Sequence, residues 1–405
     1  MAAGRVVDTE ELAPDLLGHE VVEPFSYPYE WSFTMLADAA LLHLDLVLEA
    51  LGEGLWTKDA SAYNVTFRGP RPVFVDVGSF APATGGPWPG YRQFCQHFLF
   101  PLLLTAETGV DFRPWLRSSL DGLAAGDLAR LLPVRARLRS RALRHVVLPV
   151  LAQRMARRPG QRVADELAAS GFTAELARAS LDRLRATVAG LAWRPRSPWV
   201  DYGRTCSYTP ADRRAKGAFV AAALAERPPG TVWDLGTNDG TYARMAADAG
   251  ARVVAVDGDA AAVDALYRRL RSLGGEPPGI LPLVVDLTNP SPAQGWRSEE
   301  RAGLLARCRP TEVLALAVVH HLCLVGGIPL AEVVAWLASL GAPVVLELVH
   351  PEDPMADELL ARTPPGTHDD YTVANGERLL GRHFRVGATE VLPSGTRTLY
   401  RLRPR

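Results

Sequence analysis

The stretch from Thr231 to Asp259 runs TVWDLGTNDGTYARMAADAGARVVAVDGD, and its pattern decides the fold. An acid closes each of its two short apolar runs, Asp234 after the first and Asp257 after the second. Glycines in the turn between them allow backbone N–H groups to approach a ligand beside the positive end of the following helix. The pattern predicts a nucleoside-binding βαβ unit. Its expected elements are a strand (Thr231–Trp233), a turn (Gly236–Gly240), a helix (Thr241–Ala249) and a second strand (Arg252–Val256).

The spacing of the acids and glycines indicates which nucleoside derivative binds. A dinucleotide site has the pattern G-x-G-x-x-G, whose glycines admit a pyrophosphate, whereas this turn has D-x-G-x-x-x-G from Asp234 to Gly240. A carboxylate at Asp234 would repel a pyrophosphate and suits an ammonium group, such as that of S-adenosylmethionine (SAM). Asp257, 21 residues after Gly236, suits hydrogen bonds to ribose hydroxyls. On these residues the stretch resembles motif I of class I SAM-dependent methyltransferases; the alternatives are another nucleotide or a vestigial site.

The rest of the C-terminal half continues the alternation of strands and helices. Such alternation is typical of an α/β fold with a mostly parallel sheet covered on both faces, and the resemblance implies a seven-stranded, Rossmann-like sheet. The further strands are expected at Ile280–Val285, Val313–Val319, Pro343–Leu348, Phe384–Leu392 and Thr396–Leu402. The further helices are expected at Leu330–Leu340, Met355–Ala361 and Tyr371–His383.

Ligands of such sheets lie beyond the carboxyl ends of the strands, and the polar residues of the motif fall there. The resemblance places Asp286, after the third strand, at the adenine amino group. Lys216 and Lys58 are the only lysines among 44 basic residues; Lys216 is expected to pair with the cofactor carboxylate or to lie on a helix surface. The expected cofactor contacts are Asp234, Gly236, Thr237, Asn238, Gly240, Asp257, Gly258, Asp286 and Leu287, with Tyr208 and Lys216 covering the pocket.

Two histidines follow the fourth expected strand, where an acceptor should meet the methyl group. Transfer from a sulfonium needs an aligned nucleophile and, for a hydroxyl or acidic carbon, removal of its proton. A neutral imidazole suits that role, so His321 or His320 is the candidate base, with His321 favoured and the other expected to be structural. An alternative is a metal site of His320, His321, Glu347 and His350, as in metal-dependent methyltransferases that act on RNA ends. We expect no metal.

Residues 58–80, KDASAYNVTFRGPRPVFVDVGSF, carry a second motif after an expected helix at Phe33–Leu51. D-x4-N, a strand and then D-x-G resemble the catalytic and metal-binding loops of protein kinases and aminoglycoside phosphotransferases. The resemblance implies a base at Asp59 and magnesium ligands at Asn64 and Asp76. Only about thirty residues precede the helix, and they contain no glycine loop. We therefore expect a reused scaffold that shapes the substrate pocket, with a phosphotransferase or binding module through residues 58–78 as the alternative.

Several phrases along the chain together resemble a nodulation-protein-type subgroup of SAM methyltransferases found among bacterial biosynthetic genes. The phrases are WSFTMLADAALLHL, KDASAYNVTF, PWPGYRQFCQHFLFPLLL, SPWVDYGRTCSYTPADRRAKGAFV, DLGTNDG, HHL and SGTRTLY. The resemblance implies methyl transfer to a small-molecule or carrier-tethered intermediate. It makes the N-terminal part an integral, mostly helical α+β accessory region. The expected divisions are residues 1–110 (accessory region with kinase-like loops), 111–196 (helical, arginine-rich connecting or substrate region) and 197–405 (SAM-binding methyltransferase domain).

Residues 111–194 show helical spacing, including Leu151–Met155 and Val163–Leu167, and contain a run of basic residues. Ten arginines and no acid fall between Arg130 and Arg162. The run is expected to be a solvated helix face. The alternatives are a patch for an acidic partner, such as a phosphopantetheinyl carrier protein, and a nucleic-acid arm. Nucleic acid is disfavoured because no aromatic residues interleave the arginines and the chain has a net charge of -1.

Composition sets the remaining bounds. At 405 residues the chain is long enough for two domains. Its four cysteines are far apart without a CxxC pattern, so reduced thiols and no structural zinc are expected. The first residues lack an apolar signal core, and the longest apolar run, Val313–Leu330, is broken by histidines and glycines. These features predict a soluble, cytoplasmic protein with no membrane partner.

Overall fold

The computed structural model describes residues 4–84, 86–148, 150, 173–195, 197, 208–226, 230–273 and 279–405. The expected helical segments Leu151–Met155 and Val163–Leu167, and Cys206, lie outside the described residues. By its internal contacts the chain divides into two compact units, Met1–Arg196 and Ser197–Arg405. Among the described residues no helix is both long and apolar enough to span a bilayer.

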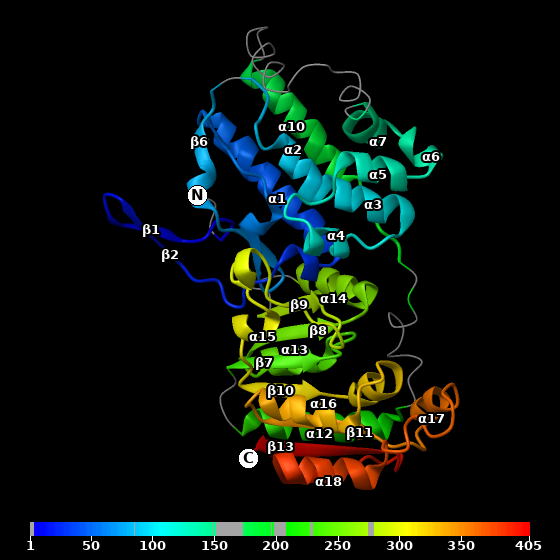
Figure 1. Cartoon of the computed structure of the whole chain (residues 1–405). Coiled ribbons are helices and arrows are strands. Elements are labelled where there is room, and N and C mark those ends of the chain that lie inside the picture. The colour runs from blue at the N-terminus through cyan, green and yellow to red at the C-terminus, as the bar shows by residue number, and fades with distance from the viewer. Residues whose placement is uncertain are drawn as a thin grey trace. The chain divides into compact units, whose positions relative to one another are not determined.

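The C-terminal unit is built on one seven-stranded sheet (Figure 1) with the order β12-β13-β11-β10-β7-β8-β9. Five strands are parallel, and β13 pairs antiparallel with both β11 and β12. The order reverses direction at β7, which is where open α/β sheets bind their ligands. The strands are β7 (Thr231–Leu235), β8 (Arg252–Asp257), β9 (Ile280–Val284), β10 (Glu312–Ala315), β11 (Val344–Val349), β12 (Phe384–Val391) and β13 (Arg397–Pro404). The expected seven-stranded α/β fold is confirmed.

The helices of this unit cover the two faces of the sheet in separate groups. One core cluster joins α12, α13 and α14 to alternate strand residues such as Val232, Leu314, Val345 and Leu399. Because side chains alternate along a strand, Leu348 lies on the opposite face, where it meets Gly376 of α18, and α18 packs on α16. The helices are α12 (Pro210–Ala225), α13 (Thr241–Asp248), α14 (Ala260–Ser272), α15 (Leu304–Arg307), α16 (Leu330–Ser339), α17 (Pro354–Leu360) and α18 (Val373–His383).

The fourth strand is shorter than the sequence predicts. An apolar run from Val313 to Val319 led us to expect one strand, but pairing with β7 and β11 ends at Ala315. Ala317 has a φ of 52°, in the left-handed region, so the chain leaves the sheet there. The remaining apolar residues enter a helical turn that continues as the π-helix η7 (His321–Val325). Apolar periodicity cannot separate a buried strand from a buried turn of this length.

The N-terminal unit combines short two-stranded sheets with helices. Its longest helix, α1 (Phe33–Gly52), begins at Ser32, whose hydroxyl accepts the N–H of Met35, and it lies beside α10 (Figure 1). The strand pairs are β1 (Thr9–Ala13) with β2 (Leu16–His19), β3 (Leu55–Thr57) with β6 (Phe80–Pro82), and β4 (Val65–Arg68) with β5 (Arg71–Phe74). The other helices include α2 (Tyr91–Phe94), α3 (Phe100–Thr108), α4 (Arg113–Ser118), α5 (Ala125–Leu131), α6 (Val134–Arg137), α7 (Ser140–Ala142), the π-helices η4 (Cys95–Leu99) and η5 (Leu143–Val147), and α10 (Ala174–Ala189).

Gly240, the residue immediately before α13, is a turn position that requires glycine. Its φ is 73°, and a Cβ there would lie 2.6 Å from Cδ1 of the buried Leu266. We expect Gly240→Ala to lower the free energy of unfolding by about 2 kcal/mol, from backbone strain and this clash together, as measured by urea denaturation.

A matched control is Gly381→Ala in α18, where a Cβ meets nothing within 4 Å. Since alanine is the better helix former, this variant should be more stable than the natural chain by up to about 1 kcal/mol. If Gly240→Ala were as stable as the natural chain, the expected backbone strain at position 240 would be contradicted.

Candidate functional site

Three aspartates gather at the carboxyl edge of the sheet. Asp234 lies near the end of β7, Asp257 ends β8, and Asp286 follows β9. Neighbouring parallel strands bring these ends to one edge. The Asp257 carboxylate accepts the N–H of Asn238 and of Asp259, each at 2.9 Å. The predicted site acids therefore follow three neighbouring strands at one edge of the sheet, starting from β7, where the strand order changes direction.

Burial sets the protonation behaviour of two of these acids. Asp234 is 2 % exposed, and burial raises its pKa to about 6, although a hydrogen bond from Thr237 and the charge of Lys216 oppose the rise. The Thr237 hydroxyl donates to Asp234 at 2.7 Å. Burial also raises the pKa of Asp257 against its backbone hydrogen bonds. Asp286, by contrast, is exposed, and its Oδ1 accepts the N–H of Thr288 at 2.8 Å.

The glycine turn differs from the expected N–H cradle. The N–H groups of Gly236 and Thr237 donate to the carbonyl of Val256 at 2.9 and 3.0 Å, and that of Gly240 to Thr237 at 2.8 Å. These donors bind the protein's own backbone, so they do not form an anion site. The turn instead fits closely against its surroundings, because a Cβ on Gly236 would lie 3.3 Å from the Val318 side chain. It therefore suits a ligand that is recognised by carboxylates rather than one held through phosphates.

A buried ion network adjoins this edge, on the sheet face covered by α12. Lys216 of α12, 4 % exposed, pairs with Glu347 of β11 at 2.7 Å, and Glu347 is fully buried. Arg397 of β13 lies 3.3 Å from the same carboxylate and 2.8 Å from Asp353. The Tyr208 hydroxyl donates to Glu347 at 2.6 Å and lies 2.9 Å from Lys216 Nζ. The default expectation of a lysine on a helix surface is therefore wrong for Lys216, because its ammonium group is buried against Glu347.

The two cations of the network, Lys216 and Arg397, determine the charge state of Glu347. Burial alone would raise the pKa of Glu347, but Lys216 and Arg397 outweigh it and lower that pKa, so the carboxylate stays ionised. The Lys216 ammonium lies 4.6 Å from the ring centre of Tyr208 and 4.8 Å from that of Tyr242. These contacts fix one tyrosine before α12 and one on α13 beside the predicted cofactor edge.

The two histidines lie side by side, with ring centres 4.0 Å apart. His320 is fully buried, and neither ring nitrogen has a hydrogen-bond partner among the described residues. Burial lowers its pKa well below 6.5, and His321, Arg397 and Lys216 lower it further. His321 is half-buried; burial and Arg397 lower its pKa too. Both imidazoles are therefore neutral at pH 7.

The alternative metal site is not assembled. Within the described ranges no three His, Cys, Asp or Glu side chains gather where they would hold an ion. Glu347 is held by the ion network, and His350 lies 2.8 Å from the Thr398 hydroxyl through Nε2. The four residues proposed as ligands do not converge.

The kinase-like residues of the N-terminal unit do lie near one another. Asn64 donates to Asp76 at 2.8 Å across the β4–β5 pair. Burial raises the pKa of Asp76, and the charge of Asp59 raises it further, while Lys58 opposes the change. The Asp59 carboxylate accepts the N–H of Ser61 at 2.8 Å. The kinase-like residues Asp59, Asn64 and Asp76 thus lie near one another, and their function stays a prediction.

Sequence reasoning missed Arg397 and Asp353, which complete the ion network. A signal existed in the last strand, where Arg397 and Arg401 alternate with Leu399 and so share its buried face. A buried arginine requires a buried acid. Arg401 is indeed paired with Glu312 of β10. The sequence could have indicated the need for acids, but not which ones.

The strand order and the acids at its carboxyl edge define residues 197–405 as a domain of the class I SAM-dependent methyltransferase fold. Two solved structures are similar to it. Magnesium protoporphyrin IX methyltransferase of Synechocystis PCC 6803, with bound SAM, is 18% identical and covers 52% of this chain and 86% of that chain, with a TM-score of 0.33. The N-methyltransferase NodS of Bradyrhizobium japonicum WM9, with S-adenosylhomocysteine, is 10% identical and covers 49% and 90%, with a TM-score of 0.35.

The whole chain has a nearer relative. It is 36% identical over 417 aligned positions to the nodulation protein NoeA of Rhizobium meliloti (strain 1021), across 98% of this chain and 86% of that protein. The chain belongs to the NoeA family of nodulation proteins, which confirms the resemblance drawn from the sequence. No family model matches the chain.

The site has acidic groups that suit the hydroxyl, amino and ammonium groups of SAM. Carboxylates at Asp257 and Asp286 suit hydroxyl and amino donors, and the buried Asp234 suits an ammonium group. His320 has two buried ring nitrogens that lack partners among the described residues, as expected where a ligand supplies the missing contact. The residues present therefore fit the cofactor.

The buried pair of Lys216 and Glu347 should be essential to stability. Lys216→Met removes one of the cations that pair with Glu347, whose carboxylate has no solvent exposure. We therefore expect the free energy of unfolding to fall by about 3 kcal/mol. The control is Arg244→Met, which breaks the exposed pair with Asp248 and should cost less than about 0.5 kcal/mol.

Denaturant titration of both variants measures the difference, and adding Glu347→Gln to Lys216→Met should recover part of the loss. Equal effects at the buried and exposed pairs would show that the network does not stabilise the fold.

Proposed function

We propose that this chain transfers the methyl group of SAM to a small-molecule or carrier-tethered biosynthetic acceptor, with His321 as the base. The observation that carries the proposal is a pair of neutral imidazoles next to an edge lined with carboxylates. The loop with the histidines adjoins the glycine turn, because Val318 packs on Gly236. A base and a cofactor site in such proximity suit deprotonation of an acceptor during methyl transfer.

In this proposal each charged group of the edge has a part in binding. Asp257 accepts hydrogen bonds from the ribose hydroxyls, and Asp286 accepts one from the adenine amino group. Asp234 pairs with the ammonium group of the methionine part. Gly236, Thr237, Asn238 and Gly240 shape the turn, and Gly258 and Leu287 follow the second and third strands at the same edge. Lys216 and Tyr208, joined through Glu347, cover the pocket.

The chemical step needs one proton acceptor. SAM supplies an activated methyl group, so the acceptor's oxygen, nitrogen or carbon forms the new bond to that carbon while the carbon–sulfur bond breaks and its electron pair stays on sulfur. The acceptor's proton passes to the neutral imidazole of His321. Burial lowers the pKa of His321 and the charge of Arg397 lowers it further, so this imidazole is unprotonated and available at pH 7.

Residues 58–78 support a second, narrower proposal, that of a binding module. The contact between Asn64 and Asp76 and the charge of Asp59 beside them favour a site for a cation or a polar ligand in the N-terminal unit. Phosphotransfer would also need groups that bind the phosphates of a nucleotide.

His321→Ala should lower the rate of methyl transfer by a factor of roughly 10² or more, because general-base catalysis contributes about that much. Affinity for S-adenosylhomocysteine should change less than about twofold. The assay follows transfer of tritium from labelled SAM to the small-molecule, protein and RNA fractions of an extract from the organism that encodes the chain. In the natural protein the rate should stay level as the pH falls through 6.5 and drop only at lower pH, since the pKa of His321 is lowered.

His19→Ala, at an exposed histidine of the N-terminal unit, is the control and should leave the rate unchanged. Label that enters only RNA would refute the small-molecule acceptor. An unchanged rate in His321→Ala would refute the assigned base.

A further inference from the structure

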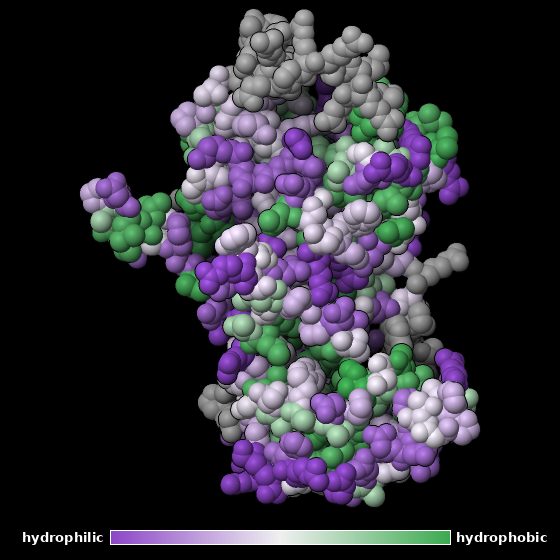
Figure 2. All heavy atoms as spheres, viewed as in Figure 1, coloured by the Kyte–Doolittle hydropathy of each residue, from purple (hydrophilic) through white to green (hydrophobic). Residues whose placement is uncertain are grey.

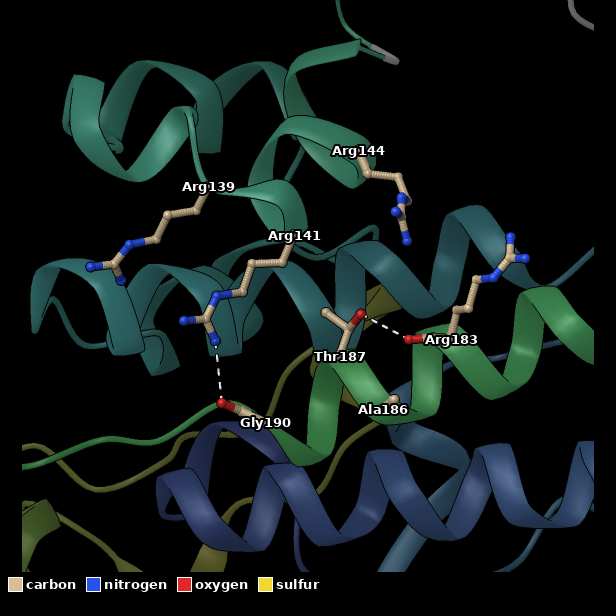
Figure 3. Close-up of a pocket in the computed structure, with 7 residues that line it drawn as sticks. All are labelled: Arg139, Arg141, Arg144, Arg183, Ala186, Thr187 and Gly190. Carbon is tan, nitrogen blue, oxygen red and sulfur yellow. Dashed lines mark hydrogen bonds between the residues drawn. The ribbon is translucent and has the colours of Figure 1, made fainter.

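Four arginines line a hollow of about 570 Å³ in the N-terminal unit (Figure 3), here called the arginine hollow. Arg139, Arg141 and Arg144 come from the segment that contains α7 and η5, whereas Arg183 comes from α10. In Figure 3, Arg144 reaches from one wall and Arg183 rises from the other. Two segments some forty residues apart thus direct positive charge into one space.

The helix that forms one wall is fixed in place from its other side. Leu181, Leu184 and Val188 of α10 are buried, and Arg185 and Arg178 bind Asp45 and the Leu48 carbonyl of α1. The opposite face carries Arg183 and a floor of small residues, Ala186, Thr187 and Gly190. Helical residues three and four apart share a face, so this floor is a preformed surface on which another chain's side chains can approach α10.

The positive charge of the hollow is only partly neutralised. Glu107 lies 2.6 Å from Arg139 and 3.4 Å from Arg141, so one carboxylate serves two guanidinium groups. Arg141 also donates to the Gly190 carbonyl at 3.2 Å. Arg144 and Arg183 have no acidic partner in the part of the chain that the structure describes. Guanidinium groups that face one space without counter-charge favour binding of carboxylates or phosphates.

Exposed apolar side chains flank the same segment. Val134 and Leu138 are 69% and 71% exposed, and Leu131 and Leu148 are 41% and 52% exposed. Figure 2 shows hydrophobic surface over α6 next to hydrophilic surface. Apolar groups gathered among arginines are typical of protein interfaces. A small phosphate ligand would use the arginines but would leave these side chains exposed.

We propose that the arginine hollow and its apolar flank dock an acidic, amphipathic helix of another protein. Carboxylates of that helix pair with Arg144 and Arg183, and its apolar side chains cover Val134 and Leu138. Nucleic acid fits less well, because none of the described residues that line the hollow is aromatic. The proposed docking does not depend on the proposed methyl transfer, and it can be tested independently of it.

The probe is a synthetic helical peptide with glutamates along one side and leucines beside them, labelled for fluorescence anisotropy and mixed with the full chain. We expect binding that weakens as salt rises. Arg144→Glu and Arg183→Glu should each weaken it about tenfold, because charge reversal places like charges together. Leu138→Ser should also weaken it about tenfold through lost apolar contact. The control Arg382→Glu reverses an exposed arginine on α18 and should have no effect.

Two competitors separate the proposal from generic anion binding. Pyrophosphate and single-stranded RNA should displace the peptide weakly, and a peptide with serine in place of leucine should bind at least tenfold less tightly. The proposal is overturned if the peptide does not bind, if Arg382→Glu weakens binding as much as Arg144→Glu, or if Leu138→Ser has no effect while pyrophosphate or RNA competes fully.

Discussion

The buried ion pair between Lys216 and Glu347 connects the elements beside the carboxyl edge of the sheet. It joins α12 to β11 on one face of the sheet, and Arg397 extends the contact to β13. A carboxylate without solvent exposure is tolerated only with such partners, so the positions of these three elements depend on one another. The Tyr208 hydroxyl donates to the same carboxylate, so the residue that precedes α12 is also held against the core of the sheet.

The same cations contribute to the proposed chemistry. Lys216 and Arg397 hold Glu347 ionised. Burial is the main reason that both histidines are neutral, and the charge of Arg397 lowers both of their pKa values further. A neutral imidazole can accept a proton, and in the proposed site the acids on neighbouring strands would bind the hydroxyl and amino groups of a nucleoside. One network therefore adjoins both the proposed base and the proposed cofactor edge, and it contains Lys216 and Tyr208, the residues proposed to cover the pocket.

The sequence predicted local features well and distant pairings poorly. The Asp234–Gly240 turn and the strand ending at Asp257 follow from short-range patterns, and both are present. The predicted strand through Val319 is wrong after Ala315, because a left-handed residue at Ala317 leaves no trace in apolar periodicity. Glu347, the acid that pairs with Lys216, lies more than a hundred residues away in the sequence, so no local pattern identifies it. The roles of the predicted site residues stay predictions.

Calorimetric titration tests the SAM site most directly, with S-adenosylhomocysteine in one experiment and ATP with magnesium in another. We expect S-adenosylhomocysteine to bind the natural chain, ATP with magnesium not to bind, and Asp257→Ala to weaken the first affinity at least about tenfold through lost ribose hydrogen bonds. Binding of ATP with magnesium, but not of S-adenosylhomocysteine, would contradict the methyltransferase assignment and place the active site at Asp59 and Asp76.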